Sequence, residues 1–207
     1  AETFLVEDGQ ARAEIIIAED APRSTELAAV ELQTYIEKIT GAELPRSVKP
    51  SNPDAVRIYV GRSRFTDELG IDVDDLKDGA FRIKSGENWL ALIGCDRDFV
   101  PRGPWDRSRS NWQKEGVKAW DAMTGSYWRN PIWAGLRKDY NGNVKAFDPK
   151  RPRDASNGKT GMWSHDARGS LNAVYHFLRD LGVRWYMPGD LGEVVPTMAS
   201  ILLPRAS

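Results

Sequence analysis

The chain has 207 residues, which is enough for one domain with a substantial buried core. Its hydrophobic share of 41% and charged share of 29% are those of an ordinary globular protein, and no apolar run approaches the roughly 20 residues that a membrane-spanning helix needs. The single cysteine, Cys95, excludes an internal disulfide framework and a multi-cysteine zinc or iron–sulfur site.

The first part of the chain predicts two strands and two helices. The β-branched run "AEIIIAED" at 13–20 predicts a buried strand. The helix that follows has an apolar stripe with a period of 3.6 residues, formed by Ala28, Leu32, Tyr35, Ile36 and Ile39. Ser24 is the expected cap of its first turn, and Gly41 is its expected left-handed end. Residues 56–61 then predict a second core strand, and residues 63–69 a short helix behind it.

A hairpin and a second long helix follow. The hairpin is predicted at 79–94, because two strand-like runs surround residues 85–88, which favour a turn. The helix has a second apolar stripe, formed by Leu171, Val174, Tyr175, Leu178 and Leu181. At its start Gly169 permits close backbone approach and Ser170 is the expected cap, while Gly182 is the expected end.

Two further strands complete the predicted fold. The run "VRWYM" at 183–187 is expected to return as a core strand with Trp185 and Tyr186 as large packing residues. The run "SILLP" at 200–204 is expected to form a last edge strand. This order of elements predicts an α+β fold. We expect a mixed sheet with its helices packed on one face.

A long interruption separates the hairpin from the second helix. We predict one α+β domain over 1–207, with its core at about 1–95 and 168–207 and an insertion at about 96–167. The insertion contains six of the eight tryptophans. From 101 to 168 there are 14 Lys/Arg against 7 Asp/Glu, a net charge of +7, whereas the rest has 15 against 23, a net charge of −8. Such a basic block often faces an anionic partner or an acidic neighbouring surface.

The composition of the insertion suits an acidic sugar. Indole faces stack on sugar rings, and arginine pairs with carboxylate or sulfate groups in bidentate fashion. The candidates for stacking are Trp105, Trp112, Trp120, Trp128, Trp133 and Trp163. The candidates for anion pairing are Arg107, Arg109, Arg129 and Arg137. A small core within the insertion or docking on a neighbouring domain explains the same composition equally well. Single-stranded nucleic acid also fits, but we expect no nucleic-acid partner.

Catalytic residues are not predicted in this chain. Glycoside hydrolysis needs two carboxyl groups about 5 to 9.5 Å apart, and Asp96, Asp98 and Asp166 are the candidates. However, carboxylates at strand ends are usually solvated or capping groups, and the adjacent side chains of "SHD" at 164–166 seldom form a triad. The chain has only two histidines, His165 and His176. We therefore expect no catalytic residue, no metal site and no cofactor.

Four segments carry a family resemblance: "AAVELQTYIEKITGAELP", "IYVGRS", "DGAFRIKSGENWLALIG" and "RGSLNAVYHFLRDLGVRWYMPGDLGEVVP". In this order they resemble the domain that precedes the catalytic barrel in α-glucuronidases and β-N-acetylhexosaminidases, especially the version in large secreted bacterial proteins of uncharacterised glycoside-hydrolase type. The resemblance covers about residues 13–95 and 168–204. The Trp-rich insertion departs from the shorter family pattern.

The resemblance implies an accessory role. In those families this domain is an α+β two-layer sandwich, in which two main helices cover one face of a mixed, largely antiparallel sheet. The catalytic carboxylates lie on a following (β/α)8 barrel, so the expected partner is that barrel. An acidic oligo- or polysaccharide is a further expected partner if the insertion borders the sugar site. The parent would be bacterial and extracytoplasmic, either periplasmic or secreted, with no membrane span. Because the chain begins Ala1-Glu2-Thr3 without Met, we expect an upstream segment to have been removed. The alternatives are a free-standing carbohydrate-binding module for acidic polysaccharide and an independent hydrolase.

Overall fold

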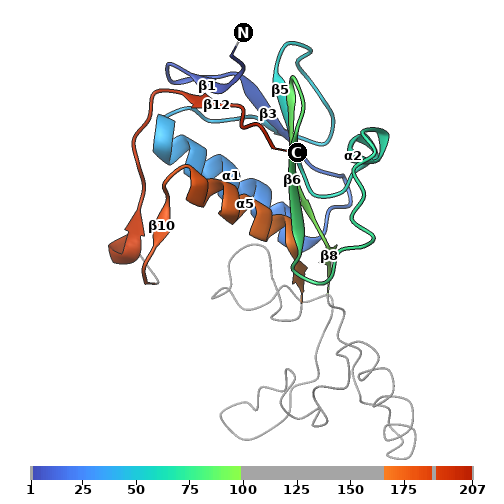
Figure 1. Ribbon diagram of the computed structural model, residues 1–207. Helices are drawn as coiled ribbons and strands as arrows, with labels where there is room; N and C mark the ends of the chain where they lie inside the picture. Colours follow the sequence, from blue (N-terminus) through green and yellow to red (C-terminus); the bar gives the residue numbers. More distant parts are fainter. Residues whose placement is uncertain (1, 99–165, 188–189, 207) are drawn as a thin grey trace, which may run out of the picture. The chain divides into compact units, whose positions relative to one another are not determined.

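Figure 1 shows the computed structural model, which describes residues 2–98, 166–187 and 190–206. Residues 1–98 and 166–207 form one compact unit. Its elements are β1 (Phe4–Glu7), β2 (Gln10–Ala11), β3 (Ala13–Ile16), α1 (Arg23–Thr40), β4 (Arg46–Ser47), β5 (Val56–Val60), α2 (Arg64–Glu68), β6 (Phe81–Ser85), β7 (Trp89–Gly94), β8 (Asp96–Arg97), β9 (Ala167–Arg168), α5 (Gly169–Asp180), β10 (Arg184–Trp185), η4 (Asp190–Gly192), β11 (Glu193–Val194) and β12 (Ile201–Leu202). The fold is α+β, as the order of predicted elements indicates.

The central sheet has five strands in the order β4-β3-β5-β7-β6. The strand β3 runs parallel to β4 and β5, and β5 runs parallel to β7, while β6 and β7 form the predicted antiparallel hairpin. The expectation of a largely antiparallel sheet is therefore wrong for this sheet. The crossover through α1 explains part of the difference, because it returns the chain to the sheet in the direction of β3. After α2 the chain re-enters as β6 in the opposite direction to β5, and the turn of the hairpin then brings β7 back parallel to β5.

The two long helices, α1 and α5, pack against each other on one face of the central sheet (Figure 1). α1 buries the whole of its predicted apolar stripe. α5 buries Leu171, Val174 and Leu178 of its predicted stripe, whereas Tyr175 and Leu181 are only partly buried. Both predicted glycine stops are confirmed, because Gly41 has a φ of 78° and Gly182 a φ of 104°. Burial of the facing stripes thus fixes the helices over the sheet.

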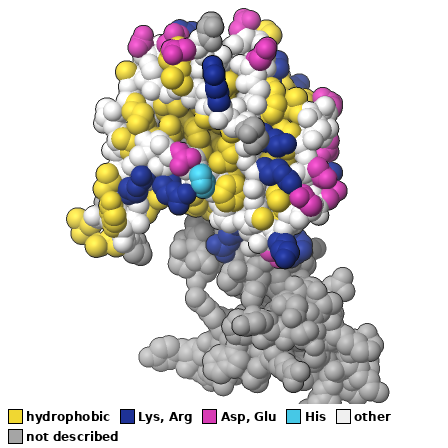
Figure 2. Space-filling model, in the orientation of Figure 1, with side chains coloured by type: hydrophobic (Ala, Val, Ile, Leu, Met, Phe, Trp, Pro, Cys, Tyr) yellow, Lys and Arg dark blue, Asp and Glu magenta, His cyan; other side chains and the backbone are white. Residues whose placement is uncertain are grey.

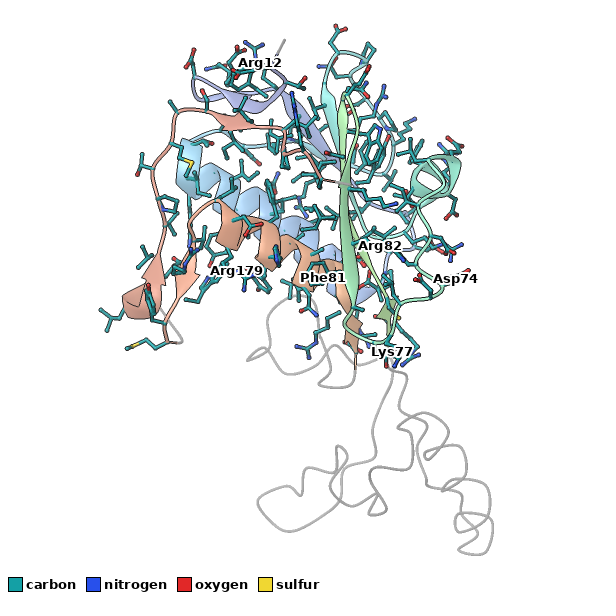
Figure 3. The ribbon with its side chains drawn as sticks, in the orientation of Figure 1. Arg12, Asp74, Lys77, Phe81, Arg82 and Arg179 are labelled. Carbon is teal, nitrogen blue, oxygen red and sulfur yellow. The ribbon has the colours of Figure 1, made fainter. Side chains whose placement is uncertain are left out.

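The opposite face of the sheet is covered by α2 and the connection after it. Ile71 from this connection packs with Tyr59 and other apolar side chains in a second core cluster. Figure 3 shows Arg82 and Asp74 on this side of the sheet, and Phe81 on the side of the long helices. This thin covering is an addition to the two layers that the sequence predicts.

The prediction of a core strand at 183–187 is wrong. Only β10 is extended in this run, and it pairs with β11 in a two-stranded sheet separate from the central one. Trp185 and Tyr186 are 39% and 76% exposed, because the chain leaves the core after the buried Val183. The predicted last strand is confirmed as β12, which lies at the edge of the three-stranded sheet β12-β1-β2.

Neither predicted serine cap is correct. α1 begins at Arg23 and α5 at Gly169, so Ser24 and Ser170 both lie inside the first helical turn. Their hydroxyl groups bind other segments instead, because Ser24 Oγ donates to the Ala167 carbonyl oxygen at 3.0 Å and Ser170 Oγ donates to the Asp96 carboxylate. These bonds tie both helices to the residues on either side of the insertion.

Candidate functional site

The predicted sugar-contacting residues all lie outside the described residues. They are Trp105, Trp112, Trp120, Trp128, Trp133, Trp163, Arg107, Arg109, Arg129 and Arg137. His165 also lies outside. The stacking and anion-pairing roles of these side chains therefore stay predictions.

The candidate carboxylates lie close to the point where the insertion begins and ends. We call residues 96–98 and 166–168 the insertion root. Its two strands, β8 and β9, pair antiparallel, with Asp96 opposite Arg168 and Arg97 opposite Ala167. The chain therefore enters and leaves the compact unit at adjacent positions.

Asp96 caps the second long helix. Its carboxylate accepts a bond from the Ser170 backbone N–H at 2.9 Å and another from the Ser170 hydroxyl. Burial raises the pKa of Asp96, while the bonds from Ser170 act against that rise. A carboxylate that satisfies an N–H of a first helical turn acts as a helix cap.

The two other carboxylates of the insertion root bind Arg23, the first residue of α1. The Arg23 backbone N–H donates to Asp98 Oδ1 at 3.0 Å, so Asp98 satisfies the first turn of that helix. The Arg23 guanidinium lies 2.9 Å from Asp166 Oδ1, and the Asp166 side chain is fully buried. All three carboxylates thus hold helix ends or the ion pair beside them.

A metal role has no support in the part of the chain that the structure describes. No group of three or more His, Cys, Asp or Glu side chains there could hold a metal ion. His176 lies on α5, with Nδ1 3.2 Å from Asp180 Oδ2 one helical turn later, and its ring contacts Phe81. This histidine is therefore part of the helix surface.

Among the described residues, most of the exposed large apolar side chains lie elsewhere, on the run predicted as a core strand and on the residues that follow it. We call residues 184–187 and 190–194 the docking ribbon; it comprises β10, η4 and β11. Its exposed apolar residues are Trp185 (39%), Tyr186 (76%), Met187 (58%), Leu191 (97%) and Val194 (50%). Figure 2 shows apolar side chains gathered at this end of the compact unit, at the lower left, beside basic side chains. Such a patch is typical of an interaction surface.

The base of the docking ribbon is packed on both long helices. The Trp185 ring makes T-shaped contacts with two tyrosine rings. The centroid of Trp185 lies 5.3 Å from that of Tyr35 on α1 and 5.2 Å from that of Tyr175 on α5. The Trp185 Nε1–H donates to the Tyr35 hydroxyl at 2.7 Å, and the Tyr175 hydroxyl donates to Glu31 at 3.1 Å. Trp185 therefore attaches the docking ribbon to both long helices.

A carboxylate completes this base. The Tyr35 hydroxyl donates to Glu193 Oε1, and Lys38 Nζ donates to Glu193 Oε2 at 2.8 Å. Burial and then the bond to Glu193 raise the pKa of Tyr35 to about 12. The bonds from Lys38 and Tyr35 lower the pKa of Glu193. At neutral pH the glutamate is thus a charged acceptor between a neutral phenol and an ammonium group.

The tip of the docking ribbon is closed by a tight backbone contact. The Tyr186 N–H donates to the Gly192 carbonyl oxygen at 2.8 Å. A Cβ atom at Gly192 would lie 2.2 Å from the Met187 carbonyl oxygen, so a side chain has no room there. This contact holds the backbone of Tyr186 and Met187 against that of Gly192.

Comparison with protein-family models and with curated proteins finds no match to this chain. The assignment of a role therefore depends on the geometry and on the resemblance noted above. Among the described residues, no helix combines the length and apolarity required to cross a membrane.

Sequence reasoning missed the docking ribbon as a surface. Its apolar residues follow a glycine helix stop, and that pattern predicts a core strand as readily as an exposed ribbon. A useful signal was present in the composition: Tyr186, Met187 and Leu191 lie close to Gly189, Gly192 and Pro188, which do not suit the centre of a strand. Apolar residues without room for a strand indicate a turn in which they are exposed.

Proposed function

We propose that this chain is a non-catalytic accessory domain of a bacterial, extracytoplasmic protein of glycoside-hydrolase type. In this proposal the docking ribbon binds the catalytic (β/α)8 barrel of the same polypeptide. The single observation that carries it is a group of exposed aromatic and aliphatic side chains on a ribbon whose base is fixed. The family resemblance supplies the nature of the partner.

The chemistry of the docking ribbon favours a protein partner. Aromatic residues and methionine are enriched in protein interfaces, where a few of them supply most of the binding free energy. Tyr186 and Met187 are exposed on the docking ribbon together with Leu191, which is almost fully exposed. A sugar would use aromatic faces, whereas the aliphatic members of this group gain most from contact with another apolar protein surface.

The insertion root supports the non-catalytic part of the proposal. Asp96 and Asp98 satisfy helix N-termini, and Asp166 is buried against Arg23. A hydrolytic pair needs one carboxyl group to donate a proton and the other to attack or activate water at the sugar. Carboxylates that hold helix ends are poorly placed for that task, because their oxygen atoms already accept structural bonds.

The docking test separates the chain from the rest of its polypeptide. The chain and the proposed barrel segment are produced as two proteins, and their binding is measured by titration calorimetry. We expect Leu191→Asp to weaken binding at least about tenfold, because a charge would be buried at the centre of the interface. Leu69→Asp is the matched control, since Leu69 is also exposed but lies after α2. Equal losses from both variants, or no binding by the unchanged chain, would reject the proposal.

A free-standing carbohydrate-binding module remains the second candidate, because the insertion combines six tryptophans with a net charge of +7 between 101 and 168. Affinity gel electrophoresis with uronic-acid and sulfated polysaccharides distinguishes the two. Retardation that disappears in Trp105→Ala/Trp112→Ala, together with no binding to a barrel, would replace docking by glycan binding as the function.

A further inference from the structure

The docking ribbon is joined to the first long helix through one carboxylate. We infer that Glu193 is a positioning residue, which latches the docking ribbon to α1 in its charged form and releases it in acid. This inference deepens the proposed function, since it concerns the same surface. It is nevertheless tested on the chain alone, without any partner.

The geometry makes Glu193 the point where the docking ribbon and α1 meet. One carboxylate oxygen accepts from the Tyr35 hydroxyl and the other from Lys38 Nζ at 2.8 Å. Tyr35 and Lys38 are three residues apart, so they lie on the same face of the helix. Trp185 pairs directly with Glu193 across the two strands, and it also binds Tyr35. Both strands are thereby bound to one turn of α1.

The groups around the latch determine its charge balance. From α1, Lys38 provides the positive charge and Tyr35 provides a neutral donor. Glu31 lies one turn earlier on α1, and its negative charge helps to raise the pKa of Tyr35. From α5, Tyr175 binds Glu31 and thereby occupies that second carboxylate. On the docking ribbon, the Arg184 guanidinium donates to the carbonyl oxygens of Arg179 and Val183, at 2.5 and 2.8 Å. Lys38 is therefore the cation that holds Glu193.

The direction of the acid effect follows from this environment. Lys38 and then Tyr35 hold the pKa of Glu193 below its ordinary value. A group whose pKa is lower in the folded state stabilises that state above its ordinary pKa. This stabilisation is lost as the pH falls through the lowered value, because protonation removes the ion pair with Lys38. The latch is thus closed at neutral pH and opens in the acid range.

Amide hydrogen exchange of the whole chain, followed by NMR, tests the latch. The reporter is the Tyr186 N–H, which bonds to Gly192 within the docking ribbon. The internal reference is the Leu181 N–H at the end of α5, which bonds to Phe177. We expect Glu193→Ala to lower the protection of the Tyr186 amide about tenfold and to leave the reference unchanged.

The charge is tested by two more variants and a control. Lys38→Met removes the cation and keeps an apolar stem, and Glu193→Gln keeps an acceptor without charge. Both should remove the loss of protection at Tyr186 that the unchanged chain shows as the pH falls from about 5 to about 2, a window that lies around and below the ordinary pKa of a glutamate. Glu37→Gln is the matched control, because it removes a negative charge from an exposed position on the same helix. It should behave like the unchanged chain.

The outcomes separate the latch from docking. Unchanged protection of Tyr186 in Glu193→Ala would overturn the latch, and so would an equal loss at Leu181. If Leu191→Asp still abolished barrel binding in that case, the docking proposal would stand alone. Conversely, the expected exchange pattern with no barrel binding would leave a latched ribbon whose partner is another surface.

Discussion

Two glycines allow the backbones of β7 and α5 to touch. A Cβ atom on Gly94 would lie 2.4 Å from the Gly169 carbonyl carbon, and one on Gly169 would lie 2.4 Å from the Cys95 nitrogen. The contact is reinforced by bonds from Cys95 N–H to the Ala80 carbonyl oxygen and from Gly169 N–H to the Cys95 carbonyl oxygen, each 3.0 Å long. Close packing, rather than an unusual φ, is therefore what these positions require.

Gly169→Ala should destabilise the domain by about 2–3 kcal/mol, because backbone atoms must move to admit the methyl group. Alanine favours a helix over glycine by about 1 kcal/mol, so propensity alone gives the opposite sign. Chemical denaturation measures the difference in the free energy of unfolding. Gly41→Ala is the comparison: it has a φ of 78° but open space around a Cβ atom, and about 1 kcal/mol is expected there. A smaller loss at Gly169 than at Gly41 would refute this account.

The sequence reveals only part of such residue-level features. The stops at Gly41 and Gly182 could be predicted, because a glycine stop is a local property of a helix end. A close approach at Gly169 could be expected from its missing side chain, but the sequence does not show that the approaching backbone is that of Gly94 and Cys95. The cap on α5 could not, because its oxygen atoms come from Asp96, which is 74 residues away in the chain. Serine near a helix start is a good local cap, and only the tertiary structure shows that a distant carboxylate has taken its place.

At the level of elements, helices are predicted better than sheet order. The stripes of α1 and α5 are visible because each helix buries one side against the same sheet. The parallel pairing of β3 with β5 has no local signal, since it depends on the crossover through α1. The apolar residues of β10 likewise predict a core strand, although β10 is exposed. Whether an apolar strand is buried depends on which other elements cover it, and the local sequence does not show this.

Two leucines test this distinction between buried and presented side chains. Leu178→Ala should cost about 2–5 kcal/mol of stability, because its side chain is fully buried between α5 and its neighbours. Leu191→Ala should change stability by about 0.5 kcal/mol or less, because Leu191 is 97% exposed. Thermal or chemical unfolding of both variants measures the contrast. A large loss for Leu191 would mean that the docking ribbon belongs to the core.

At the scale of the whole molecule, the compact unit carries its own core. Its buried apolar side chains come from both sides of the insertion and include Ile15 and Ile58 of the central sheet and Leu178 of α5. Asp96 lies directly opposite Arg168, so the two sides of the insertion meet at paired strands. The sequence indicated this organisation through its composition, whereas the sugar contacts assigned to the insertion concern residues outside the described part.

Replacement of residues 99–165 by a short Gly/Ser linker should leave the compact unit folded. The ends to be joined belong to the paired strands β8 and β9, so a linker of about five residues closes the gap without strain. Dispersion of the amide spectrum and a cooperative thermal transition are the measurements. A molten or insoluble product would show that the insertion supplies part of the core. Retention of barrel binding by this variant would place the docking surface outside the insertion.

The first long helix has a different neighbour at each end. Arg23, its first residue, binds Asp98 and Asp166 of the insertion root, whereas Tyr35 and Lys38 hold the docking ribbon. Twelve residues of α-helix separate Arg23 from Tyr35, a length of about 18 Å at 1.5 Å per residue. The same helix therefore holds the insertion root near its start and the docking ribbon near its end, so any rigid-body tilt of α1 would move both contacts together.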